Sequence, residues 1–206
     1  MTKEIELTVY GVDHDAIITK LNECGATFVG KYYFRAVNFQ IIKKNSITSI
    51  EPGNSDEQYY TRWARVRTDG IHTTLTLKEQ KGTSMTERNE YEVSVNDFLK
   101  TVKIIMMLNS SAKYSYIESE REEYKLGKAT IDLNKRPHLP YSIEIEAQSL
   151  KTINDVYKKL EIKKEPMKSI AVDDREFYAL FGIDYREVEL EYTTKLKKML
   201  EELNTL

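Results

Sequence analysis

The feature that most constrains the fold is the alternation of apolar and charged residues along several short segments. In residues 141–147, YSIEIEA, the odd positions are apolar, whereas Glu144 and Glu146 occupy even positions. Side chains of a strand alternate between faces, so these carboxylates share one face, about 6–7 Å apart along the chain. Like charges at this spacing repel. Either water on an exposed sheet face or a bound cation must offset that repulsion.

The same parity recurs in other segments. In residues 71–77, 91–95 and 129–133 the odd positions are mainly apolar, and in residues 64–67 the even ones are. The opposite positions carry charge of both signs, on Glu4, Glu6, Arg65, Arg67, Lys78, Arg88, Glu90, Glu92 and Asp132. Ordinary strands with a solvated outer face account for alternation alone. If helices cover the apolar face instead, the charged face lines a wet barrel.

Helix and turn signals separate these segments. Asp13 is a plausible N-cap for a helix that ends at Gly25, and Asn96 is the expected N-cap of a second helix. Asp69-Gly70 predicts a hairpin, residues 150–160 predict a helix, and residues 43–58 read as a loop. We expect an α+β fold with an eight-stranded antiparallel closed β-barrel, covering helices and a C-terminal helix. The expected domains are residues 1–183 and a helical extension over residues 184–206, packed on the same domain.

Composition excludes several classes of protein. The net charge of −2 over 206 residues lacks the excess of bases typical of nucleic-acid-binding proteins. A single cysteine, Cys24, excludes an internal disulfide framework and a cysteine-rich zinc site. The first residues lack the apolar core of a signal peptide, and no apolar run reaches the length of a membrane span. The expected location is cytoplasmic, with no membrane partner.

A family resemblance accounts for the charged face. The ordered segments EIEL, RWARVRTDG, LTLKE, RNEYEV, EREEY, TIDL and IEIEA resemble the CYTH superfamily of triphosphate tunnel enzymes, closest to its class IV adenylyl cyclase-like branch, over about residues 4–178. The resemblance implies a divalent cation, Mg²⁺ or Mn²⁺, and a small-molecule triphosphate such as ATP or polyphosphate. Carboxylates bind such hard cations, and guanidinium and ammonium groups bind phosphate oxygens.

The resemblance also implies roles for residues at matching positions. The metal set, including residues that support the ligands, is Glu4, Glu6, Asp132, Glu144 and Glu146. The phosphate contacts are Arg65, Arg67, Lys78, Arg88, Arg121 and Lys168. Glu90 and Glu92 match tunnel acids that pair with bases or assist the metal. Glu6, Lys78 and Arg121 are the expected catalytic residues.

Two departures from the family pattern keep several functions open. Thr8 and Ser119 stand where the family has lysines. A class IV adenylyl cyclase would convert ATP to cyclic AMP and pyrophosphate. The alternatives are an inorganic, nucleoside or thiamine triphosphatase of the same fold, and a non-catalytic nucleotide- or polyphosphate-binding protein.

Two further interactions follow from other segments. The segment RWARVR and the 14 tyrosines suggest RNA binding as a further hypothesis. The balanced net charge does not favour it. Apolar residues recur at helical spacing in residues 186–204, at Tyr192, Leu196, Met199 and Leu203. This stripe is expected to dock on the parent barrel, with a homodimer as the alternative.

Overall fold

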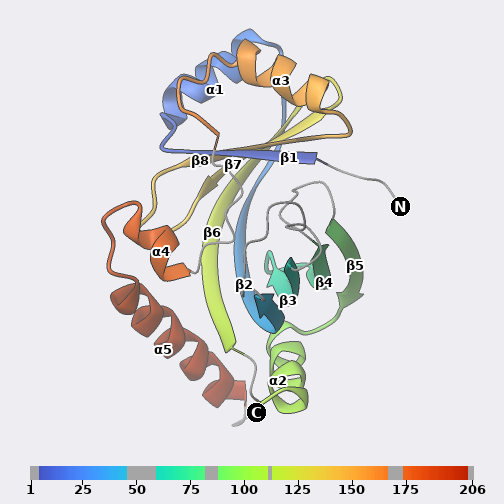
Figure 1. Ribbon diagram of the computed structural model, residues 1–206, viewed down its shortest axis with the longest axis vertical. Coiled ribbons are helices and arrows are strands. Elements are labelled where there is room, and N and C mark those ends of the chain that lie inside the picture. Colours follow the sequence, from blue (N-terminus) through green and yellow to red (C-terminus); the bar gives the residue numbers. More distant parts are fainter. Residues whose placement is uncertain (1–4, 46–58, 82–87, 111–112, 167–173, 204–206) are drawn as a thin grey trace, which may run out of the picture. The chain divides into compact units, whose positions relative to one another are not determined.

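The fold is an eight-stranded sheet accompanied by helices. The computed structural model describes residues 5–45, 59–81, 88–110, 113–166 and 174–203 (Figure 1). The strands are β1 (Ile5–Tyr10), β2 (Thr27–Asn45), β3 (Tyr59–Thr68), β4 (Thr73–Lys81), β5 (Arg88–Val95), β6 (Lys113–Leu126), β7 (Ala129–Lys135) and β8 (Ser142–Ala147). The helices are α1 (His14–Glu23), α2 (Phe98–Leu108), α3 (Leu150–Lys159), α4 (Asp174–Ala179) and α5 (Tyr185–Leu203).

The strand order confirms the predicted α+β plan. The sheet runs β1-β8-β7-β6-β2-β3-β4-β5, and neighbouring strands such as β1 and β8 or β3 and β4 pair antiparallel. The order ends at β1 and β5, so closure of the barrel stays a prediction. The described residues belong to two compact units, Met1–Tyr33 with Ser119–Ser169 and Phe34–Glu118 with Ile170–Leu206. The predicted division at residue 183 also stays a prediction.

In the first unit, α1 and α3 lie on one face of β1, β7 and β8 (Figure 1). The apolar positions of the strands point into this core, where Ile131, Ile143 and Ile145 are fully buried. Ile153 of α3 and Leu21 of α1 complete the contact. Because side chains alternate along a strand, burial of this face places the charged positions together on the opposite face.

Local signals define two boundaries as predicted. The Asp13 side chain accepts a hydrogen bond from the Ala16 backbone N–H at 3.0 Å, which confirms it as the N-cap of α1. The hairpin between β3 and β4 forms at Asp69-Gly70, where Gly70 has a φ of 93°. The Asp69 carboxylate accepts from the backbone N–H groups of Ile71 and His72, at 2.8 and 2.6 Å. These bonds fix the turn that aligns the two strands.

In the second unit, α2 contacts β3, β4 and α5. Tyr192 and Leu196, from the predicted stripe, are buried on α5 together with Val188. The ring of Tyr192 meets that of Tyr116 edge to face, with centroids 5.8 Å apart. The buried stripe of α5 therefore packs against other residues of the second unit. No helix among the residues that the structure describes is long and apolar enough to cross a membrane.

Three expectations were wrong in detail. Asp97, not Asn96, caps α2, because its side chain accepts from the Lys100 backbone N–H at 2.9 Å. Strand β2 continues to Asn45 as one strand, so the predicted loop starts later than residue 43, and the rest of it, residues 46–58, lies outside the described residues. No helix in the described part of the chain covers the apolar face of β5, where Tyr91 and Val93 are each 57% exposed.

The corrected cap gives a stability test. Asp97→Ala is expected to lower the free energy of unfolding by about 1 kcal/mol, because an N-terminal backbone N–H of α2 loses its acceptor. Asn96→Ala, at the adjacent exposed position, is the matched control and is expected to change it by less than about 0.5 kcal/mol. Urea unfolding followed by circular dichroism measures both. A larger loss in Asn96→Ala than in Asp97→Ala would contradict the assignment.

Candidate functional site

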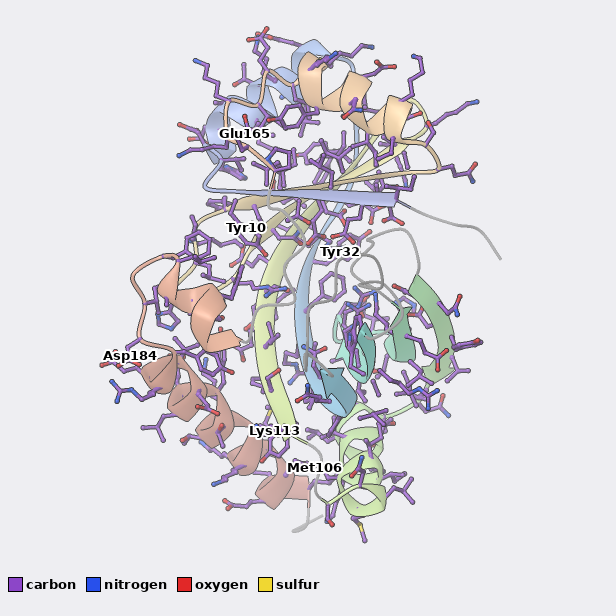
Figure 2. All side chains as sticks on the ribbon, viewed as in Figure 1. Tyr10, Tyr32, Met106, Lys113, Glu165 and Asp184 are labelled. Atoms are coloured by element: carbon purple, nitrogen blue, oxygen red, sulfur yellow. The ribbon has the colours of Figure 1, made fainter. Side chains whose placement is uncertain are left out.

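In the first unit, strand register places the charged positions in three rows across β6, β7, β8 and β1. One row is Arg121, Asn134, Ser142 and Tyr10; the next is Glu123, Asp132, Glu144 and Thr8; the third is Lys125, Thr130, Glu146 and Glu6. Figure 2 shows Tyr10 on the side of the strands away from α1 and α3. We call these twelve residues the polar face of the first unit. Acids outnumber bases on it.

Arg121 contacts three other residues of this face. Its Nε donates to Asn134 Oδ1 at 2.8 Å, and its Nη2 donates to Glu144 Oε2 at 2.9 Å. Its Nη1 forms an ion pair with Asp132 Oδ2. The guanidinium is therefore held by groups from two neighbouring strands, in the fork geometry that also suits phosphate.

Asp132 has a perturbed acidity. Burial raises the pKa of its carboxyl to about 6, the positive charge of Arg121 opposes the rise, and the charge of Glu144 adds to it. Its Oδ1 atom is buried and has no hydrogen-bond partner in the described part of the chain. One of the two Asp132 carboxylate oxygens therefore makes no hydrogen bond in the described part of the chain.

Glu6 and Glu146 lie directly opposite each other on β1 and β8. Thr8 Oγ1 donates to Glu6 Oε1 at 3.0 Å, so the residue that replaces the family lysine orients this carboxylate. Like charges in directly opposed strand positions destabilise a sheet unless a cation or water separates them. A cation or water between the two strands would relieve this repulsion.

Burial also raises the pKa of the nearby Tyr10 hydroxyl. The charge of Arg136 opposes the rise, and the charges of Glu144 and Glu6 add to it. Tyr10 therefore stays a neutral phenol at physiological pH and is able to donate a hydrogen bond on the acidic face.

The second unit has a polar face of its own. Register places Asn38, Arg65, Thr76 and Glu92 in one row across β2 to β5, and Gln40, Trp63, Lys78 and Glu90 in the next. Arg67 belongs to the same face, and its guanidinium carbon lies 4.7 Å from the centroid of the Phe34 ring. Arg65, Arg67 and Lys78 therefore share a face, as the alternation predicts.

Two acids of this face have partners on it. Lys78 Nζ pairs with Glu90 Oε1, and Thr76 Oγ1 donates to Glu92 Oε2 at 2.7 Å. Thr76 is completely buried. Glu90 therefore pairs with a base, as the resemblance implied for the tunnel acids, and Glu92 is oriented by a hydroxyl group.

The structure locates most of the predicted site residues. Glu6, Arg121, Asp132, Glu144 and Glu146 come together in the first unit, and Arg65, Arg67, Lys78, Glu90 and Glu92 share a face of the second. Glu4 and Lys168 lie outside the described residues. Arg88 aligns with Gln80 at the edge of the second face, and only its backbone is described.

Sequence reasoning missed Asn134 and Thr76. Asn134 has the parity of Asp132, and Thr76 has the parity of Lys78, so their faces were predictable. Their contacts with Arg121 and Glu92 were not, because neither residue type is charged and neither stood out from the alternation.

The donor set fits a hard divalent cation. Carboxylate oxygens suit Mg²⁺ and Mn²⁺, and Mg²⁺ commonly takes only one or two protein carboxylates together with water and substrate phosphates. Glu6 and Glu146 supply such a pair. Within the described ranges, which omit Glu4, no three His, Cys, Asp or Glu side chains are grouped to hold a metal by themselves.

Comparison with known protein families decides the affiliation. The model of the CYTH domain family matches residues 58–204. The chain belongs to the CYTH family. That match includes the part of the second polar face on β3, β4 and β5, together with Arg121, Asp132, Glu144 and Glu146 of the first. A search of curated proteins finds no match.

Solved structures share the fold of this CYTH protein. The PH1012 protein from Pyrococcus horikoshii OT3 has a TM-score of 0.59 at 22% identity, covering 79% of this chain and 94% of that one. HpAC1 from Hippeastrum, named as a candidate adenylyl cyclase with a dominant triphosphatase activity, has a TM-score of 0.52 at 11% identity, covering 85% and 94%. A candidate adenylate cyclase from Bacillus halodurans has a TM-score of 0.52 at 16% identity, covering 80% and 92%.

The acidity of Asp132 predicts a pH-dependent stability. Its folded pKa of about 6 exceeds the usual 3.8, so the folded state binds more protons than the unfolded state between these values. The free energy of unfolding should therefore fall as pH rises from about 4 to 6, by roughly 3 kcal/mol from this group. In Asp132→Asn, the free energy of unfolding should not show this decrease.

Urea unfolding of wild type and Asp132→Asn at several pH values between 4 and 7 measures the difference. Asp155→Asn is the control, because Asp155 is exposed and its pKa is lowered by a hydrogen bond from Lys151. Parallel pH profiles for wild type and Asp132→Asn would show that Asp132 ionises normally.

Proposed function

We propose that this CYTH protein is a divalent-metal-dependent enzyme that acts on a triphosphate, with Mg²⁺ or Mn²⁺ as the cation. The observation that carries the proposal is the polar face of the first unit, where the opposed carboxylates Glu6 and Glu146 lie beside the Arg121 cluster. Acids for a cation and a fork-shaped base for phosphate are what a metal-bound polyphosphate requires. The closed tunnel that the resemblance implies is part of this proposal.

The proposed roles follow the family motifs. Glu4, Glu6, Asp132, Glu144 and Glu146 hold the cation or orient its ligands. Arg65, Arg67, Lys78, Arg88, Arg121 and Lys168 bind phosphate oxygens, and Glu90 and Glu92 pair with these bases or assist the metal. A bound cation would neutralise charge on the phosphate oxygens. Glu6, Lys78 and Arg121 are the residues proposed to act on the reacting phosphate.

The proposed reaction is that of a class IV adenylyl cyclase. The ribose 3′-oxygen of ATP forms a bond to the α-phosphorus, the bond from that phosphorus to the bridging oxygen breaks, and pyrophosphate leaves. Arg121 and Lys78 stabilise the charge that develops on the phosphoryl oxygens. The protein needs no covalent intermediate for this step, since positioning and electrostatics supply the catalysis.

A triphosphatase of the same fold is the second candidate. Water, rather than a ribose hydroxyl, would attack the terminal phosphorus, and the bond from that phosphorus to the bridging oxygen would break, giving orthophosphate and the remaining diphosphate. Two observations favour it: the dominant triphosphatase activity named for HpAC1, and the absence of two family lysines at Thr8 and Ser119. Fewer bases would suit a substrate that is held mainly by its terminal phosphates.

One experiment distinguishes these functions. The purified protein is incubated with ATP, GTP, tripolyphosphate or thiamine triphosphate, each with Mg²⁺ or Mn²⁺, and the products are separated by chromatography. Cyclic AMP with pyrophosphate supports the cyclase, and orthophosphate supports the triphosphatase. Binding without turnover under every condition would overturn the enzyme proposal and leave a non-catalytic binding protein.

Removing one charge of the opposed pair should impair catalysis. Glu146→Gln keeps the shape of the side chain and is expected to lower metal-dependent turnover at least about tenfold, because a proposed cation ligand loses its charge. Glu120→Gln, on the opposite face of β6, is the control and should retain wild-type turnover. Equal rates for Glu146→Gln and wild type would remove Glu146 from the metal set.

Thr8 should affect the affinity for the cation through its hydrogen bond to Glu6. Thr8→Val keeps the shape of the side chain but removes the donor to Glu6 Oε1, and we expect Mn²⁺ to bind about tenfold more weakly. Thr8→Ser retains the hydroxyl group and should bind Mn²⁺ like wild type. Calorimetry with Mn²⁺ and no substrate measures both. Similar affinities for the Val and Ser variants would show that Thr8 does not act through its hydroxyl.

A further inference from the structure

We propose that Asn134 is a positioning residue, which fixes the Arg121 guanidinium so that its Nη atoms are presented for anion binding; the inference rests on the phosphate role proposed for Arg121. No charge marks Asn134 in the sequence, yet its Oδ1 accepts from Arg121 Nε at 2.8 Å. The two residues also face each other in the register of β6 and β7. The contact therefore follows from the fold itself.

The orientation of the Asn134 amide is determined by its partner. An Nε–H group only donates, so the amide oxygen must face Arg121, and a reversed amide would oppose two donors. The Nδ2 group consequently points away from the guanidinium. It is buried, and it has no hydrogen-bond acceptor in the part of the chain that the structure describes.

Stability does not explain an asparagine at this place. Asn134 is only 6% exposed, and a buried amide donor without an acceptor destabilises a fold. An apolar residue of similar size would avoid that penalty. The asparagine instead fixes the position of Arg121. Functional sites often keep residues that lower the stability of the fold.

The two carboxylates alone leave the guanidinium less constrained. Asp132 and Glu144 contact Nη1 and Nη2, and both are groups for which a cation would compete. Asn134 is neutral and contacts the third nitrogen, so its bond persists when either carboxylate changes partner. It also holds Arg121 without adding negative charge to a face on which acids already outnumber bases.

The test reads the Arg121 Nε–H group directly, in the free full-length chain labelled with ¹⁵N. Its side-chain NMR signal is assigned by its loss in Arg121→Lys, and its hydrogen exchange rate is then measured. Asn134→Leu should raise that rate at least about tenfold, because the donor loses its protein acceptor. Tripolyphosphate titrated in the presence of a chelator, which prevents metal-dependent turnover, should bind about tenfold more weakly.

Three further variants separate positioning from charge and from folding. Asn134→Ala removes the amide without adding volume and carries the same expectations as Asn134→Leu. Asn134→Asp keeps an acceptor, so exchange should stay slow, whereas tripolyphosphate should bind more weakly because of the added charge. Thr19→Val removes the hydrogen bond from Thr19 Oγ1 to the Asp15 carbonyl on α1, at 2.9 Å and outside the polar face, and should change neither measurement.

The two measurements fail in different ways. An exchange rate unchanged in both Asn134→Leu and Asn134→Ala would overturn the positioning role. Failure of the wild type to bind tripolyphosphate even with Mg²⁺ present would instead count against the proposed function, while the exchange rates would still decide whether Asn134 holds Arg121.

Discussion

The ion pairs of Arg121 are the interaction on which the charged face of the first unit depends. Asp132 is buried and Glu144 is partly buried on adjacent strands, and two carboxylates so placed repel each other in a medium of low dielectric. Arg121 contacts both, and Asn134 completes the fork. Removing the guanidinium would leave buried charge without compensation, which is far more costly than losing an exposed ion pair.

The alternation of side chains explains how much of this was predictable. Strand geometry forces residues two apart to the same face, so Ile143 and Ile145 had to lie opposite Glu144 and Glu146 once the segment was recognised as a strand. The Asp69-Gly70 hairpin was recognised from its turn residues, and the shared face of Arg65 and Arg67 followed from alternation. These features depend on local covalent geometry, which the sequence contains.

The features that were not predicted depend on packing and on backbone position. Asn96 and Asp97 are both good N-caps, and only the backbone conformation decides which side chain reaches the Lys100 N–H. Alternation shows that Tyr91 and Val93 share a face, but not whether anything covers it. The Asn134 contact required the register of β6 against β7, because the two residues are thirteen positions apart in the sequence.

Glu144 contacts Arg121 and is also a proposed cation ligand, so the binding of a cation and the binding of an anion are coupled. Glu144 accepts from the guanidinium, so a cation that engages Glu144 withdraws negative charge from Arg121 and makes that base more available to an anion. By linkage, an anion on Arg121 must then strengthen cation binding by the same factor. Cation and polyphosphate would thus be taken up cooperatively, with each weakly bound in the absence of the other.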